Sequence, residues 1–186
     1  MALSNRGKAK LDLNDSKSAL IDFNKAILNN PNNAIAWCNR AKIKMDNKDY
    51  KSAIIDLNKS IKLDPDFALA YYNRGLIKFD TKDISGSISD YTKAINLDKT
   101  YALAYNYRAF ALYSLNNLSA SLSDFNLAIL YNPNLAIAYN NRGWVKFCMN
   151  DTKGAIEDYS KAIQLQPNFL DPYNNCLLYT SPSPRD

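Results

Sequence analysis

The feature that most constrains the fold is an interval of 34 residues that recurs without insertion through most of the chain. Arg stands at five positions spaced by this interval, and Asp follows each Arg after 16 residues. The pairs are Arg6 and Asp22, Arg40 and Asp56, Arg74 and Asp90, Arg108 and Asp124, and Arg142 and Asp158. Self-similarity at a fixed period predicts an array of small stacked units rather than one globular core.

With Ala34 taken as position 1, the array divides into five repeats. They span residues 1–33, 34–67, 68–101, 102–135 and 136–169. Gly, Ala or Ser holds positions 8, 20 and 27, and Pro holds position 32 in every repeat except at Lys99. Apolar residues spaced three or four apart predict two helices in each repeat, and the Pro ends the second one. Asp or Asn at position 16 is predicted to cap the start of that second helix.

This pattern resembles the tetratricopeptide repeat family over residues 1–169. The resemblance implies an all-α fold, a right-handed α-solenoid of stacked antiparallel helix pairs, with five 34-residue repeats and the start of a sixth. Two positions depart from the family pattern. Position 7 is Arg where Leu is usual, and position 15 holds Asn or Lys where Gly is usual.

The Arg and Asp residues recur in every repeat, as scaffold residues do, and this favours a structural role over a catalytic one. A guanidinium group matches a carboxylate through two parallel hydrogen bonds. The pairs named above are therefore predicted to form salt bridges between helices, either within a repeat or between adjacent repeats.

The resemblance also implies that the first helices line a concave groove, with positions 2, 5, 6, 9, 12 and 13 facing it. Position 6 is Asn5, Asn39, Asn73 and Asn141, and Tyr107 interrupts this column. The column is similar to the asparagine ladder of O-linked N-acetylglucosamine transferase. A side-chain amide offers both a donor and an acceptor to a peptide bond. The alternative is that these amides bond locally to their own helices.

Large apolar residues enter the same predicted groove in the later repeats. Position 9 changes from Lys8 and Lys42 to Leu76, Phe110 and Trp144, and a core position would not accept Lys. These three residues are predicted anchors for a partner. Position 12 adds Phe79, Tyr113 and Phe147, and position 5 adds Tyr72. The alternative for position 12 is packing against the neighbouring repeat.

These features predict a non-catalytic protein–protein interaction scaffold that binds an extended peptide or a partner helix in the groove. The alternative is the repeat region of a truncated larger enzyme, such as a glycosyltransferase. A further family subgroup grips the C-terminal carboxylate of heat-shock chaperones through Lys residues at positions 2 and 5. Neither position supplies Lys here, so that activity is not expected.

Composition excludes several other classes. The chain has no His and three Cys, so no Ser-His-Asp catalysis, metal site, cofactor or disulfide framework is expected. The net charge of +5 is not concentrated in any block, so nucleic-acid binding is not expected. No apolar run approaches about 18 residues, so no membrane span is expected. A cytoplasmic location is the default expectation.

The 34-residue repeat pattern is not continued after Asn175. Residues 170–175 fit the start of a sixth repeat, whereas residues 176–186 resemble a translated sequencing adapter and are interpreted as a non-native tail. Solenoids usually carry polar caps at both ends, and neither end shows one. Self-association through uncapped ends is therefore expected.

Overall fold

The computed structural model describes residues 2–168 of the protein, and within that range the chain is entirely helical, without strands. The ten described helices are α1 (Ala2–Asp12), α2 (Ser16–Asn29), α3 (Ala34–Asp46), α4 (Tyr50–Leu63), α5 (Ala68–Asp80), α6 (Ile84–Leu97), α7 (Ala102–Ser114), α8 (Leu118–Tyr131), α9 (Ala136–Cys148) and α10 (Thr152–Leu165). The predicted all-α class with paired helices is confirmed. The predicted start of a sixth repeat and the predicted tail lie outside the described residues.

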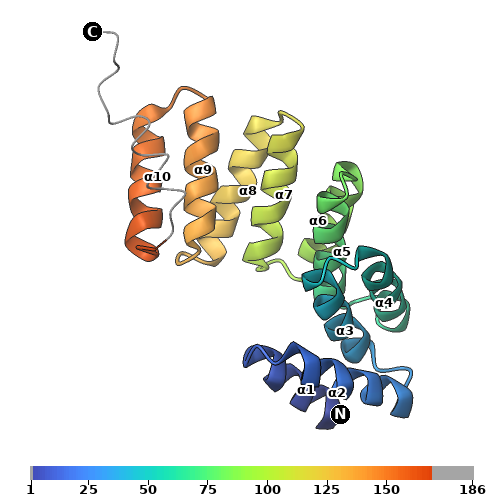
Figure 1. Ribbon diagram of the computed structural model, residues 1–186. Helices are drawn as coiled ribbons and strands as arrows, with labels where there is room; N and C mark the ends of the chain where they lie inside the picture. The colour runs from blue at the N-terminus through green and yellow to red at the C-terminus, as the bar shows by residue number, and fades with distance from the viewer. Residues whose placement is uncertain (1, 169–186) are drawn as a thin grey trace. The chain divides into compact units, whose positions relative to one another are not determined.

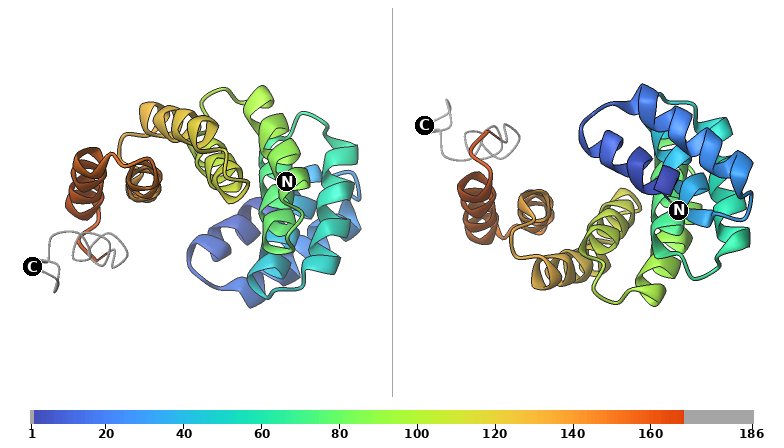
Figure 2. Two further views of the ribbon diagram at one scale, coloured as in Figure 1. Left: turned by 90° about the horizontal axis from the view of Figure 1, so that it is seen from above. Right: turned by 90° about the horizontal axis from the view of Figure 1, so that it is seen from below.

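The helices gather into two compact bodies, residues 1–98 and residues 99–186. The N-terminal body contains α1–α6, and the C-terminal body contains α7–α10 (Figure 1). Within each body the two helices of a repeat lie side by side, and the second helix of one repeat packs against the first helix of the next. Figure 2 shows these pairs from two further directions.

Local sequence signals set where the second helices begin. Each follows a residue at position 16 whose side chain accepts a hydrogen bond from the backbone N–H three residues later, as predicted. The preceding residue at position 15 takes a positive φ of 59–70° in all five turns. These left-handed residues are Asn14, Lys48, Lys82, Asn116 and Asn150. The chain thus makes the turn without the Gly that best tolerates this conformation.

Close approach of paired helices depends on the small residue at position 8. A Cβ atom on Gly75 would lie 2.6 Å from Cε1 of Tyr91, a ring that is fully buried. A Cβ atom on Gly7 would likewise lie 2.8 Å from Cε1 of Phe23. In the second repeat the partner is the smaller Leu57, and Ala41 fits. The small and large positions therefore alternate across each helix pair and leave a filled core.

No helix described between residues 2 and 168 is both long and apolar enough to cross a membrane.

Candidate functional site

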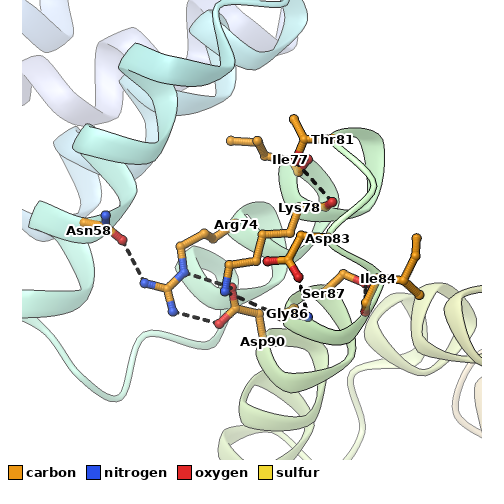
Figure 3. Close-up of polar contacts among 10 residues, drawn as sticks. All are labelled: Asn58, Arg74, Ile77, Lys78, Thr81, Asp83, Ile84, Gly86, Ser87 and Asp90. Carbon is orange, nitrogen blue, oxygen red and sulfur yellow. Dashed lines mark hydrogen bonds and ion pairs between the residues drawn. The ribbon is translucent and has the colours of Figure 1, made fainter.

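The recurring Arg and Asp side chains join the two helices of each repeat. In the third repeat Arg74 on α5 donates from Nε and Nη2 to the two carboxylate oxygens of Asp90 on α6, at 2.8 and 2.7 Å (Figure 3). The same two-bond geometry occurs in the other four repeats, at 2.6–2.8 Å. All five pairs lie within a repeat. Because the Asp side chains are nearly fully buried, these bonds satisfy carboxylates that water does not reach.

A Lys at position 11 completes this arrangement, and sequence reasoning missed it. Lys78 lies 2.8 Å from Oδ2 of Asp90, and the equivalent contacts of Lys10, Lys44 and Lys146 measure 2.7–2.9 Å (Figure 3). The sequence does contain a signal for these contacts, because Lys recurs at the 34-residue interval in four of the five repeats. The fourth repeat has Leu112 at this position.

The Arg also reaches the preceding repeat. Nη1 of Arg74 donates to Asn58 on α4 at 2.7 Å, and Arg40 and Arg142 make the same contact with Asn24 and Asn126. Aromatic residues at position 4 stack under these guanidinium groups. The centroid distance is 4.7 Å for Trp37 and Arg40. Each such Arg therefore contacts two repeats, which fits a role in holding their register.

The electrostatics of these clusters agree with a scaffold role. Hydrogen bonds from Arg6 and then Lys10 hold the pKa of Asp22 well below its usual range. The bond to Asp90 raises the pKa of Arg74 in turn. Asp22 therefore stays charged across the physiological range, and its buried carboxylate is occupied by Arg6 and Lys10, so a substrate could not reach it.

The predicted groove residues all lie on first helices, but the structure corrects the role of Tyr72. Position 5 is buried in every repeat, and Tyr72 is 8% exposed with its ring 6.1 Å from that of Tyr91. Tyr72 therefore packs toward the second helix of its own repeat. Within each body, position 5 of one repeat also contacts position 6 of the next. Cys38 meets Asn73 in this way at 3.5 Å, and Asn106 meets Asn141 at 3.4 Å.

The same contact changes the predicted Asn column. Asn73 is buried, and its Nδ2 donates to Sγ of Cys38, while Asn39 is 9% exposed. These two amides offer little surface to a peptide. Asn5 is exposed and Asn141 is half-buried. A continuous ladder is therefore not what the described residues present, and the accessible amides lie in the first and last repeats.

Burial also removes Cys38 as a reactive group. Desolvation raises the pKa of its thiol to about 12, and only a hydrogen bond from Asn73 opposes this. Such a thiol carries almost no thiolate at neutral pH. Cys38 fills space beside Asn73 in the core. Cys148 is exposed and also free of a disulfide.

Four predicted aromatic residues do come together in the C-terminal body. Nε1 of Trp144 on α9 donates to the hydroxyl of Tyr113 on α7 at 2.7 Å. The ring centroids of Phe110 and Tyr113 lie 6.3 Å apart, and those of Trp144 and Phe147 lie 6.1 Å apart. We call these four residues the aromatic cluster. Phe110 is 38% exposed and the other three are partly exposed, so the cluster presents apolar surface to solvent.

A small pocket adjoins the aromatic cluster. It has a volume of about 130 Å³ and is lined by Asn106, Tyr107, Phe110, Ile137 and Asn141. Two of these, Phe110 and Asn141, are predicted groove residues, and Phe110 belongs to both the pocket and the cluster. The C-terminal body thus places an apolar surface, a pocket and a side-chain amide on α7 and α9.

The predicted groove positions of the N-terminal body carry different chemistry. Lys8 pairs with Asp12 on α1, and Lys42 pairs with Asp46 on α3, so each charge has a partner one helical turn away. A pocket of about 450 Å³ lies beside them, and Ser4, Asn5 and Ile35 are among the residues that line it. Leu76 and Phe79 on α5 are half-buried.

No group of three or more His, Cys, Asp or Glu side chains that could hold a metal ion occurs among residues 2–168.

Comparison with solved structures supports the fold. MamA is 25% identical with a TM-score of 0.72, and the match covers 87% of this chain and 94% of that chain. YrrB, a TPR protein with an unusual peptide-binding site, is 20% identical with a TM-score of 0.70, covering 93% and 89%. The first TPR of Spaghetti (RPAP3), bound to the HSP90 peptide SRMEEVD, is 28% identical with a TM-score of 0.57, covering 59% and 86%. No curated protein matches the chain.

Comparison of the sequence with models of protein families also identifies repeats of this type. Tetratricopeptide repeat models match residues 2–33, 68–101 and 136–169, and a TPR repeat model matches residues 41–82. Together these matches span more than half of the chain, and the three tetratricopeptide repeat matches each contain one helix pair of the structure. The chain belongs to the tetratricopeptide repeat family.

Proposed function

We propose that this chain is a non-catalytic interaction scaffold that binds an extended peptide, or a partner helix, along the first helices. The observation that carries the proposal is the aromatic cluster on α7 and α9, which leaves apolar rings partly exposed beside a pocket. Large aromatic side chains at a surface supply most of the binding free energy in many interfaces.

The relatives support this class of function. YrrB has a peptide-binding site, and the RPAP3 domain holds a peptide. Peptide binding by this chain follows from the shared fold only as a proposal. The RPAP3 ligand is an acidic peptide, whereas the aromatic cluster here carries no charged residue, so a different peptide chemistry is expected for this chain.

Selection from a random peptide library tests the proposal. The full chain is immobilised, 12-residue peptides are selected, and the affinity of each enriched peptide is measured by fluorescence polarisation. Phe110→Ala removes a central ring and is expected to weaken binding at least tenfold, because truncation of an interface anchor costs about 2 kcal/mol. The matched control is Leu130→Ala on α8, which removes an exposed apolar side chain away from the first helices.

Three results are possible, and each decides whether the proposal holds. Loss of affinity for Phe110→Ala with no change for Leu130→Ala supports binding by the first helices. Enriched peptides that bind both variants as tightly as the unchanged chain place binding elsewhere, and a library that yields no binder contradicts the peptide-binding function. Circular dichroism of each variant separates loss of contact from loss of fold.

The alternative, a repeat region within a larger enzyme, stays a hypothesis. The open reading frame in genomic DNA tests it, because a catalytic domain in the same frame would support the enzyme.

A further inference from the structure

The second helices α2 and α4 repeat one pattern of charged and apolar side chains. Positions 18, 22 and 26 of the repeat lie on the same side of the helix at successive turns, and they hold Lys, Ile and Lys in both helices. We call these residues the outer basic face: Lys17, Ile21, Lys25, Lys51, Ile55 and Lys59. The later repeats have Ser89, Ser123 and Glu157 where Ile21 and Ile55 stand. Ile at this position is therefore not a general requirement for folding the repeat.

The apolar side chains of the outer basic face stand in solvent. Ile21 is 54% exposed and Ile55 is 61% exposed, and Leu28, two turns after Ile21, is also exposed. Ile55 lies in the second repeat, with α3 before its helix and α5 after it, so its exposure is not an effect of a chain end. Exposed aliphatic surface is unfavourable in water, and contact with a second apolar surface would remove that cost.

The Lys residues of this face differ from those of the first helices in having no acidic partner. On the first helices of the N-terminal body, five Lys residues each pair with an Asp: Lys8, Lys10, Lys42, Lys44 and Lys78. No Lys of the outer basic face forms such a pair with residues 2–168. The acidic residues within α2 and α4 are Asp22 and Asp56, which are buried and bound by Arg and Lys. Asp15 and Asp49 lie at the helix starts, where they cap backbone N–H groups. Between its ends, each helix therefore presents only positive charge.

Packing within the N-terminal body places the outer basic face on its convex side. Helix α3 contacts both α1 and α5, whereas α2 and α4 each pack on α3 and, within the described residues, make no comparable contact with each other. The first helices are therefore closer together than the second helices. A convex surface with protruding side chains encloses little of a bound peptide, whereas the headgroup region of a bilayer is fluid and surrounds such side chains.

We propose that the outer basic face attaches the protein peripherally to an anionic lipid bilayer. Ile21 and Ile55 enter the headgroup region, and the four Lys residues contact the lipid phosphates and carboxylates. Basic residues beside apolar ones are the combination that binds such surfaces, and each Lys near an anionic leaflet strengthens attachment about fivefold. Salt screens these charges and weakens the attachment. The role goes beyond peptide binding, because it uses second helices and leaves the first helices accessible.

Co-sedimentation of the full chain with lipid vesicles tests the proposal. One set of vesicles is an equimolar mixture of phosphatidylserine and phosphatidylcholine, and the other is phosphatidylcholine alone. The chain is expected to bind the mixed vesicles and not the neutral ones. Replacing two Lys residues, Lys25→Gln with Lys51→Gln, should raise the lipid concentration for half-maximal binding at least tenfold. The matched control is Lys153→Gln with Lys161→Gln on α10, which makes the same charge change at the same two repeat positions.

A second pair of variants tests the apolar contact. Ile21→Ser with Ile55→Ser introduces the residue that the third and fourth repeats carry at this position, and it should weaken binding to the mixed vesicles about fivefold or more. The matched control is Leu115→Ser with Leu130→Ser, which removes two exposed apolar side chains from the C-terminal body. Circular dichroism verifies that each variant is folded.

Binding to the mixed vesicles that falls in both test pairs, and in neither control pair, supports the proposal. Absence of binding to these vesicles overturns it, and so does a test pair that binds as tightly as the unchanged chain. Binding to soluble polyglutamate without binding to vesicles overturns it in favour of an acidic protein partner. None of these outcomes alters the peptide-binding proposal, because the variants lie on second helices or in turns.

Discussion

Trp144 and Tyr113 join the first helices of two consecutive repeats through one hydrogen bond, with the indole Nε1 2.7 Å from the tyrosine hydroxyl. Tyr113→Phe removes the acceptor and keeps the ring, and Trp144→Phe removes the donor. Each is expected to destabilise the fold by about 1 kcal/mol, and the double variant should show a coupling of about 1 kcal/mol because the lost bond is shared. Urea unfolding of the four proteins measures this coupling. Strict additivity would contradict the contribution of this bond.

Leu112 occupies the position at which the other four repeats place a Lys against the buried Asp. Leu112→Lys is expected to stabilise the C-terminal body by about 1 kcal/mol, because the new ammonium group would reach the carboxylate of Asp124. Denaturant unfolding monitors the change. The reciprocal control, Lys146→Leu, removes the existing contact with Asp158 and should destabilise by a similar amount. Equal stability of the two variants would show that the second cation contributes nothing.

The ring of Tyr91 leaves no room for a Cβ atom at Gly75. Gly75→Ala should destabilise the fold by about 1 kcal/mol, because the new Cβ displaces a buried ring. In a Tyr91→Leu background the same change should become stabilising, since Ala then brings its higher helix propensity without a clash. The natural precedent is Ala41, whose partner is Leu57. Thermal unfolding measures the effect of Gly75→Ala in the unchanged chain and in the Tyr91→Leu background. A loss of stability in both backgrounds would refute the packing argument.

Lys82 adopts a φ of 70°, which costs an L-residue with a long side chain about 1 kcal/mol. Lys82→Asn is expected to recover most of that cost, because Asn tolerates the left-handed region better. The reverse change, Asn116→Lys at a φ of 59°, should destabilise by a similar amount. Chemical denaturation of both variants provides the measurement. Opposite signs are predicted, and the same sign for both would argue against a backbone effect.

The pKa of Asp22 gives the stability a defined dependence on pH. Because this pKa is lower in the folded chain than its unfolded value of about 3.9, the unfolded chain binds more protons in acid. The contribution of Asp22 to stability is therefore complete above about pH 4 and declines as the pH falls below it. Urea unfolding between pH 2 and pH 7 should show this decline. Asp22→Asn should reduce its steepness, and an unchanged slope would exclude Asp22 as a source.

The parts of the structure that depend on local sequence were predictable. The N-cap at Asp15 and the pairing of Arg6 with Asp22 involve residues within one helix pair, so the repeat interval alone indicated them. The Lys contacts could have been predicted by the same step, since Lys10 and Lys44 recur in phase. The prediction that Phe110 and Trp144 line a groove came from the Lys residues at the same position in earlier repeats, and their partial exposure agrees with a position outside the core.

Other features required the packing between repeats. The burial of Asn73 against Cys38 depends on how the consecutive first helices α3 and α5 meet, and a helical face assigned from position numbers does not contain that information. The hydrogen bond between Trp144 and Tyr113 depends likewise on how closely the first helices α7 and α9 approach each other.

The central claim is that the first helices, and foremost α7 and α9, form the binding surface. The most direct test is two-dimensional NMR of the isotope-labelled full chain, titrated with a peptide selected on it. We predict that the largest shift changes fall on the side-chain amide of Asn141, the indole N–H of Trp144 and the backbone of Phe110. Changes confined to second helices such as α8 and α10, with these signals unmoved, would contradict the account.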